Sequence, residues 1–275
     1  MNGHIHIVTL PGENFMPNYL ICRLAELWRE QGHQVTVGPA ARLDADTGIM
    51  HVDRTVVPDQ CLPDNPRGHP LLNGSILNIS KRRISSNLVN MDSDYSGPVI
   101  IKTDANSSGW PERAARTNWI QRRFNYILRR AVSWRLSREL LSSNYPVVNN
   151  LSHVPGWVWK RSDLVVEKFM PEVDGEQFVL RVWVFFGDQE YGARMLSRNP
   201  VVKVRGATRY EYIDGVPETL RAVRRELAMD FGKFDYVMVG GEAVLLDVNK
   251  TPIVSRNTHL QRLASGLAAY MGRPA

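Results

Sequence analysis

Asp247 and Asn249 are the residues whose types and spacing point most directly to chemistry. They lie two positions apart in an apolar segment typical of a β-strand, so their side chains share one face. Carboxylate and amide oxygens are ligands that a hard cation such as Mg²⁺ prefers, and Mg²⁺ usually binds together with substrate phosphates. The alternative interpretation is a strand end that carries solvated polar residues.

A third oxygen ligand, Asp235, depends on the register of a hairpin predicted over 234–239 and 243–248. A three-residue loop, Gly240–Glu242, places Asp235 directly opposite Asp247. A two-residue loop turns Asp235 to the other face instead. Adjacent glycines are typical of a hairpin turn, but they leave both registers open.

Other apolar runs predict the elements that surround this hairpin. An amphipathic helix is predicted over 218–230, a helix closes the chain at 260–270, and a short helix runs from Lys81 to about Val89. In the strand predicted at 178–186, Arg181 lies between Leu180 and Val182, and the alternation places it on a polar face. Further strands are predicted at Pro98–Lys102 and Leu164–Phe169.

The first forty residues predict a strand, a helix and a second strand. His4–Leu10 is an apolar run, leucines at helical spacing follow to Gly32, and Gln34–Gly38 is again strand-like. This βαβ order favours a parallel sheet covered by helices. A proline-rich stretch over 57–70 reads as a linker, which predicts one small domain over 1–70 and a second region over 71–275.

The last hairpin resembles that of the ATP-grasp superfamily, whose members carry an Asp, then an acidic residue, any residue and Asn, followed closely by Pro. This chain has Asp235, Asp247-Val248-Asn249 and Pro252, with Asp247 where the family more often has Glu. The resemblance implies an α/β fold of the α+β ATP-grasp kind, with a small βαβ domain before a two-subdomain ATP-binding unit. It covers roughly residues 73–255.

More of the family pattern follows in order along the chain. The run Leu164–Pro171 resembles the hinge whose backbone holds adenine, with an acidic residue near the sugar or amine. Val99–Lys102 resembles the strand whose lysine contacts phosphates, and Asn73-Gly74 with Ser80-Lys81 resembles the entry to the ATP-binding subdomain. Gly175–Val184 resembles the next strand, in which Arg181 faces the phosphates.

The resemblance implies ATP and Mg²⁺ as cofactors and assigns a role to each matching position. The metal ligands are Asp235, Asp247 and Asn249, and the predicted nucleotide-binding residues are Lys81, Lys102, Ser107, Ser108, Glu167, Lys168 and Phe169. The predicted catalytic residues are Arg181 and Arg194. Arg181 matches the arginine that faces the phosphates in the family, whereas Arg194, with Arg198, is chosen because guanidinium groups suit an acyl phosphate or a substrate carboxylate. For Arg194, a solvated surface position is the alternative.

The net charge of +6 is concentrated in one segment. Residues 110–141 contain eight arginines and two glutamates, so the rest of the chain is balanced. A helix is predicted from Pro111 to about Leu141, directly after a segment with a single glycine where the family has a glycine-rich phosphate loop. Its basic flank suits single-stranded nucleic acid, an acidic substrate or ATP, or it is a solvated face or dimer contact.

The predicted activity is ATP- and Mg²⁺-dependent joining of a carboxylate to an amine through an acyl phosphate, with release of ADP. The expected substrates are small molecules or peptides, and a homodimer is possible. An ATP-grasp kinase and a non-catalytic nucleotide- or nucleic-acid-binding protein are the alternatives. Two cysteines, no long apolar run and no signal-peptide pattern predict a cytoplasmic protein without a membrane partner.

Overall fold

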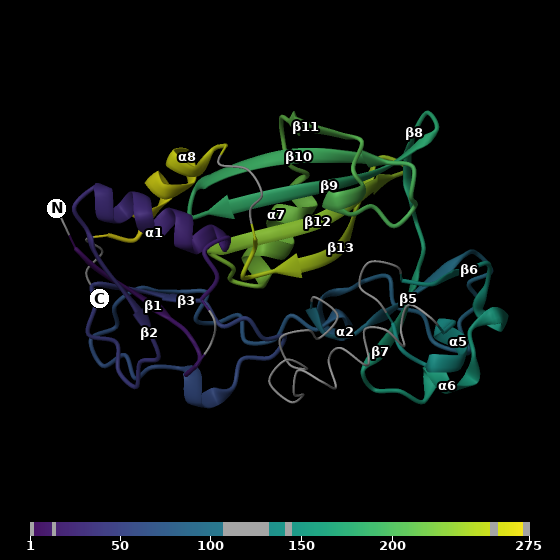
Figure 1. Ribbon diagram of the computed structural model, residues 1–275, viewed down its shortest axis with the longest axis horizontal. Helices are drawn as coiled ribbons and strands as arrows, with labels where there is room; N and C mark the ends of the chain where they lie inside the picture. Colours follow the sequence, from purple (N-terminus) through teal and green to yellow (C-terminus); the bar gives the residue numbers. More distant parts are fainter. Residues whose placement is uncertain (1–2, 13–14, 107–131, 141–144, 254–257, 272–275) are drawn as a thin grey trace.

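Three β-sheets organise the fold (Figure 1). The computed structural model describes residues 3–12, 15–106, 132–140, 145–253 and 258–271. Two sheets are formed by the C-terminal three quarters of the chain and one by the N-terminal quarter. This is the mixed α/β architecture that the sequence predicts, with a βαβ domain followed by a two-part unit.

The N-terminal sheet is parallel, with strand order β2-β1-β3-β4. The predicted helix is confirmed as α1, whose apolar stripe includes Leu20, Leu24 and Trp28, all fully buried. Because β4 belongs to this sheet, the sheet continues just past residue 70. Its elements are β1 (His4–Val8), α1 (Leu20–Glu30), β2 (Gln34–Gly38), β3 (Thr47–Met50) and β4 (Leu71–Leu72).

A small antiparallel sheet follows, with strand order β6-β5-β7. Strand β5 is buried along its whole length, which matches its apolar sequence ending in Lys102. Short helices pack beside this sheet, at the right of Figure 1. The elements of this part are α2 (Lys81–Ile84), β5 (Val99–Thr103), α5 (Trp134–Ser137), β6 (Val147–Val148), α6 (Gly156–Trp159) and β7 (Leu164–Lys168).

The largest sheet is antiparallel and has six strands, in the order β11-β10-β9-β12-β13 with β8 paired to β9. Helix α7 covers one face, where Leu220 packs with Trp183 and Phe234. The elements are β8 (Glu172–Asp174), β9 (Gln177–Phe186), β10 (Gln189–Ser197), β11 (Arg209–Ile213), α7 (Glu218–Glu226), β12 (Phe231–Val239), β13 (Glu242–Asn249) and α8 (Leu260–Ser265).

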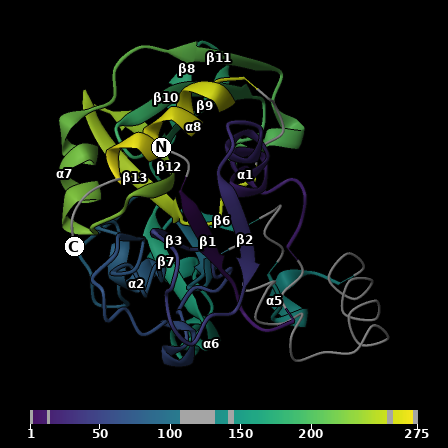
Figure 2. The ribbon, with the colours of Figure 1, turned by 90° about the vertical axis from the view of Figure 1, so that its left-hand side faces the viewer.

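Helix α8 joins the N-terminal domain to the other face of this sheet. It lies beside α1 in both ribbon views (Figures 1 and 2), and the Trp28 indole donates a 2.9 Å hydrogen bond to the Ala264 carbonyl. Leu263 and Phe186 are fully buried in the same apolar cluster. The two domains therefore share one core at this end of the sheet.

The hairpin β12–β13 combines the two registers that the sequence left open. Its loop has only two residues, because Val239 pairs with Glu242. A β-bulge at Leu246 then shifts the register, and Asp235 pairs directly with Asp247. The structure thus has the pairing expected from a three-residue loop, although a two-residue loop and a bulge produce it.

Three helix predictions are wrong in their extent. Helix α7 ends at Glu226 instead of continuing to Asp230. The helix that begins at Lys81 ends at Ile84 instead of continuing to about Val89. The long helix predicted to reach Leu141 does not continue through residues 132–140, because Ser133 is extended and Arg138 has a left-handed conformation on either side of the four-residue α5. Residues 111–131 of that prediction lie outside the described residues.

Candidate active site

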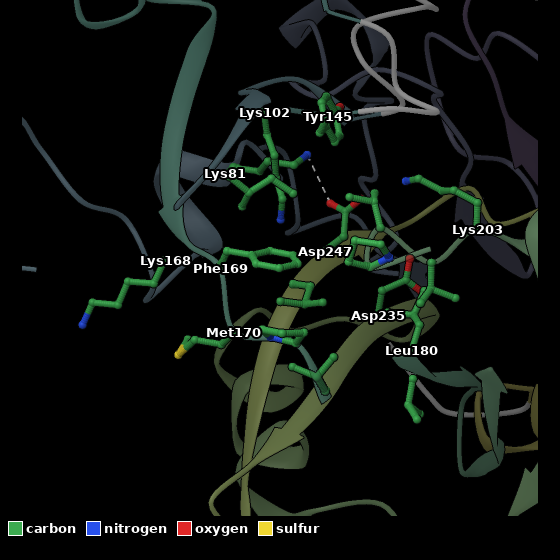
Figure 3. Close-up of a pocket in the computed structure, with 18 residues that line it drawn as sticks. Lys81, Lys102, Tyr145, Lys168, Phe169, Met170, Leu180, Lys203, Asp235 and Asp247 are labelled. Carbon is green, nitrogen blue, oxygen red and sulfur yellow. Dashed lines mark ion pairs between the residues drawn. The ribbon is translucent and has the colours of Figure 1, made fainter. Parts of the chain in front are cut away.

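A cleft lies between the small sheet and the face of the large sheet opposite α7. We call the latter the acidic face, because it carries Asp235 and Asp247 (Figure 3). The cleft is lined by Lys81, Ile100, Lys102, Tyr145, Lys168, Phe169, Met170, Pro171, Val179, Leu180, Pro200, Val201, Val202, Lys203, Asp235, Val237, Leu246 and Asp247. Apolar side chains thus meet a small number of charged groups, as in many ligand sites.

Asp247 projects into the cleft from β13 and pairs with Lys81. The Lys81 ammonium nitrogen lies 3.4 Å from Asp247 Oδ1 and also donates to the Ala105 carbonyl at 3.4 Å. Lys81 is only 3% exposed, so its charge is held largely out of water. Burial alone would raise the pKa of Asp247, but the ammonium groups of Lys81 and Lys102 outweigh it and lower that pKa.

Asp235 pairs with a lysine of its own strand. Lys233 Nζ lies 2.9 Å from Asp235 Oδ1 and 3.1 Å from Oδ2. Cross-strand pairing places Lys233 opposite Asn249, as it places Asp235 opposite Asp247. All four side chains therefore project from the acidic face.

Asn249 is oriented by a contact with the N-terminal domain. Its Oδ1 accepts a 2.8 Å hydrogen bond from the Thr251 amide. The Thr251 hydroxyl donates to Asp53 Oδ1 at 2.8 Å, and the Tyr19 hydroxyl donates to Asp53 Oδ2 at 2.8 Å. The end of β13 is thus fixed by residues from two domains.

Lys102 and Glu167 form the second buried ion pair of the cleft. They come from neighbouring strands β5 and β7, and Lys102 Nζ lies 2.6 Å from Glu167 Oε2. Glu167 is 1% exposed, and its second oxygen, Oε1, is buried without a hydrogen-bond partner among the described residues. A buried acceptor in this state favours a ligand that donates a hydrogen bond.

The predicted hinge lies at the edge of the cleft. The Phe169 ring points into it, whereas Lys168 extends away from the acidic face (Figure 3), with its ammonium 5.3 Å from the centre of the Tyr95 ring. The amides of Lys168 and Phe169 donate to the carbonyls of Asn87 and Pro98. These two amides are therefore engaged within the protein, and backbone recognition of adenine would fall to other hinge groups.

Arg181 and Arg194 are not in the cleft. They pair across β9 and β10, and Arg181 also pairs with Tyr236, which packs under α7. Both arginines therefore project from the face opposite Asp235.

There they bind carboxylates of the protein itself. Arg181 Nη2 lies 2.6 Å from Glu172 Oε1, and Arg194 contacts Glu211 at 2.5 Å and Asp174 at 3.0 Å. The structure brings neither arginine to the predicted metal ligands. Their predicted catalytic role has no support from this placement.

Comparisons with solved structures match nearly the whole chain. A RimK domain ATP-grasp protein from Sphaerobacter thermophilus superposes with a TM-score of 0.51 at 12% identity, covering 98% of this chain and 99% of that chain. The ATP-grasp ligase PsnB, complexed with a minimal precursor, gives a TM-score of 0.54 at 12% identity, with coverage of 98% and 99%. The chain has the ATP-grasp fold.

A third match extends this likeness. The macrocyclase MdnC from Microcystis aeruginosa, bound with precursor peptide MdnA, has the same architecture with a TM-score of 0.51 at 10% identity, covering 98% of this chain and 99% of that one. No protein-family model matches the sequence, and no curated protein matches it. The ATP-grasp fold is thus visible in the backbone at identities where the sequence alone retains only scattered motifs.

Lys203 and Tyr145 are cleft residues of this ATP-grasp fold that the sequence reasoning missed. The Lys203 ammonium lies 5.7 Å from the centre of the Tyr145 ring, and the Tyr145 hydroxyl is 2.9 Å from Thr103 Oγ1. Lys203 also contributes to the lowered pKa of Asp247. Neither residue belongs to a recognisable sequence motif, so only the tertiary structure reveals them.

Some predictions fall on residues that the structure does not describe. Ser107 and Ser108, and the arginines between residues 110 and 130, lie outside the described residues. Within the described part of the chain, no helix has the length and apolar character needed to cross a membrane. The described residues also hold no group of three His, Cys, Asp or Glu side chains that could bind a metal ion.

The acidic face nevertheless fits one hard cation. Asp247 and Asn249 offer a carboxylate and an amide oxygen from one strand face, a donor set that suits Mg²⁺. The two oxygens of Asp235 are both within 3.1 Å of the Lys233 ammonium. The donor set that is not held by Lys233 is therefore smaller than the three ligands predicted from the sequence.

Proposed function

We propose that this protein is an ATP-dependent ligase that joins a carboxylate to an amine and releases ADP. The observation that carries the proposal is the convergence of Lys81, Lys102, Asp235 and Asp247 on one cleft with an apolar edge. Positive groups for phosphates, oxygen ligands for a cation and a flat aromatic wall are the parts that phosphoryl transfer from ATP requires. The ATP-grasp fold of the chain supports this arrangement.

ATP would lie with its base at the hinge and its phosphates between the two sheets. The Phe169 ring and Ile100 supply an apolar wall for the adenine base. The adenine amino group would donate a hydrogen bond to the buried Glu167 Oε1. Lys102 and Lys81 lie farther inside the cleft, where their ammonium groups balance phosphate charge.

Asp247 and Asn249 would hold Mg²⁺, and Asp235 is the third residue that the sequence assigns to it. When bound, Mg²⁺ supplies charge neutralisation for the phosphates. Lys81 already balances Asp247 at 3.4 Å. The residues of this chain thus orient ATP and keep its charges compensated without any residue forming a covalent bond.

The reaction would proceed in two steps that need no protein nucleophile. A substrate carboxylate oxygen attacks the γ-phosphorus, the bond from that phosphorus to the bridging oxygen breaks, and ADP leaves. A substrate amine then attacks the acyl carbon, phosphate leaves, and the amine loses a proton as the amide forms. Positioning and charge stabilisation by lysines are the protein's contribution to such transfers.

Peptides are the substrate class that we propose first. PsnB and MdnC are both described in complex with precursor peptides or a minimal precursor, and both share this fold over 98% of the present chain. The acyl donor would be a carboxylate of a peptide, or else of a small molecule, and the acceptor would be an amine.

The test is product analysis with Mg·ATP and pools of peptides and amino acids. The proposal predicts ADP, phosphate and a new amide in equal amounts, all absent with the Lys102→Met variant. Lys160→Met is the matched control, because Lys160 is exposed and is not among the residues that line the cleft, so the variant should behave like wild type. Release of AMP and pyrophosphate contradicts the mechanism, and a phosphorylated product without an amine requirement identifies a kinase.

A further inference from the structure

The acidic face contains a positive charge as well as its oxygen ligands. Lys233 and Asp235 alternate on β12, and Asp247 and Asn249 alternate on the facing strand β13. The register pairs Lys233 with Asn249 and Asp235 with Asp247. The four side chains therefore form one patch, in which an ammonium group stands beside three potential cation ligands.

The contact between Lys233 and Asp235 involves both carboxylate oxygens. The ammonium lies 2.9 Å from one oxygen and 3.1 Å from the other, and the two side chains are 24% and 20% exposed. Asp247 is held differently, through Oδ1, which lies 3.4 Å from Lys81 and accepts from the Val248 amide at 3.2 Å. Lys233 thus lies closer to both oxygens of Asp235 than Lys81 lies to Asp247 Oδ1.

A divalent cation bound to Asp235 would have to share that carboxylate with Lys233. Mg²⁺ approaches carboxylate oxygens to about 2.0–2.1 Å, well inside the distances at which Lys233 now lies. Two cations on one carboxylate repel each other, and this patch is partly withdrawn from water, so the repulsion is weakly screened. A cation at Asp247 and Asn249 meets a weaker conflict, because Lys81 lies 3.4 Å from Asp247 Oδ1, farther than Lys233 lies from either oxygen of Asp235.

The charges of the cleft point the same way. Lys81 balances Asp247, Lys102 balances Glu167, Lys233 balances Asp235, and Lys203 adds a further positive charge near Asp247. The three pairs cancel and Lys203 leaves one net positive charge, which together with one divalent cation offsets most of the charge of the nucleotide phosphates.

We propose that Lys233 is a built-in cation that occupies Asp235, so that the cleft binds one divalent cation with ATP, at Asp247 and Asn249. This inference rests on the proposed function, because it concerns the cations that accompany ATP. It assigns Lys233 a positioning role, since Lys233 acts through Asp235 and not through contact with the reacting atoms.

Equilibrium dialysis with Mn²⁺ and a nonhydrolysable ATP analogue, AMPPNP, tests the inference. The full chain is dialysed against both, and the Mn²⁺ and nucleotide retained per chain are counted. Wild type is expected to retain one nucleotide and one Mn²⁺. Lys233→Met, which removes the charge but keeps the length, should retain two Mn²⁺, and Lys233→Arg should restore one.

A second measurement separates this role from a purely structural one. Without metal, Lys233→Met should have a lower melting temperature than wild type, because Asp235 loses its partner. Added Mn²⁺ should close that gap, since the cation replaces the ammonium, whereas a lost structural contact would leave the gap unchanged. Lys160→Met, an exposed lysine away from the cleft, should show one Mn²⁺ and no gap.

The outcomes distinguish the two proposals. Two Mn²⁺ with one nucleotide in wild type overturn the role of Lys233 and leave the proposed function standing. One Mn²⁺ in both wild type and Lys233→Met also overturns it. If wild type retains no nucleotide, the proposed function fails and the inference fails with it.

Discussion

Both faces of the large sheet carry charged side chains, but the charges have different partners on the two faces. On the acidic face, Asp235 and Asp247 are met by lysines from α2 and β12 and face a cleft. On the face toward α7, Arg181 and Arg194 are paired with carboxylates of neighbouring strands. The difference teaches that alternation in a strand identifies a polar face, while only the partners distinguish a binding site from an internal ion-pair network.

The largest expected effect concerns the acidic face. Asp247→Asn removes the counter-charge of the buried Lys81 and a cation ligand, so nucleotide turnover should fall by roughly 100-fold or more. ADP release at saturating Mg·ATP measures it. A variant that retains turnover within a few-fold would show that the acidic face is not where ATP reacts.

A substitution on the face toward α7 should lower the stability of the protein and leave its nucleotide turnover nearly unchanged. Arg181→Met leaves Glu172, which is 11% exposed, without its guanidinium partner, and the unfolding free energy should fall by about 1–3 kcal/mol. Urea denaturation measures this loss, and the ADP assay under the same conditions should stay within about threefold of wild type. A large loss of turnover in a folded Arg181→Met protein would restore the catalytic role predicted from the sequence.

At low pH the Asp247 carboxylate of the acidic face should contribute less to the free energy of unfolding. Burial would raise the pKa of Asp247, but the surrounding lysines lower it below the ordinary value. The stabilisation by the Asp247 charge is therefore complete above about pH 4 and is lost as the pH falls through the folded-state pKa. The difference in unfolding free energy between wild type and Asp247→Asn should shrink over that range, by about 1.4 kcal/mol for each unit of pKa shift. A pH-independent difference would contradict the charge account.

The smallest expected effect concerns the support of Asn249. Tyr19→Phe removes one hydrogen bond to Asp53, and stability should fall by about 1 kcal/mol. Thermal unfolding monitored by circular dichroism measures the change. The same variant should leave turnover nearly unchanged, because Thr251 still donates to Asp53. A turnover defect as large as that of Asp247→Asn would place Tyr19 in the site itself.

Local patterns predicted much of the fold. The spacing of Leu20, Leu24 and Trp28 identified α1, and apolar runs identified β1, β2, β5, β7, β9 and the final hairpin. Strand β10 was not predicted, because Gln189, Glu190 and Arg194 interrupt its apolar pattern. Their partners lie on β9 and β11, and a single-strand pattern contains no information about those neighbours.

The sequence predicted those site residues that belong to a motif. It did not predict the positions that depend on the register between strands. The pairing of Asp235 with Asp247 depends on a bulge at Leu246, and no residue type in the hairpin predicts that bulge. Arg181 pairs with Tyr236 of β12, and Asp235 pairs with Val182 of β9, so Arg181 and Asp235 lie on opposite faces of the sheet. The alternation in β9 predicted that Arg181 lies on a polar face, but it did not predict that this face is the one opposite Asp235. Lys203 reaches the cleft through an irregular segment after β10, where spacing predicts nothing.

The central claim is that nucleotide binds at the acidic face between the two sheets. A crystal structure of the full chain with Mg²⁺ and AMPPNP tests it most directly. The account predicts phosphate oxygens within hydrogen-bond distance of Lys81 and Lys102, with the adenine against Phe169. Nucleotide bound beside Arg181 and Arg194 under α7, or crystals grown in saturating Mg·AMPPNP that hold no nucleotide in the cleft, would contradict it.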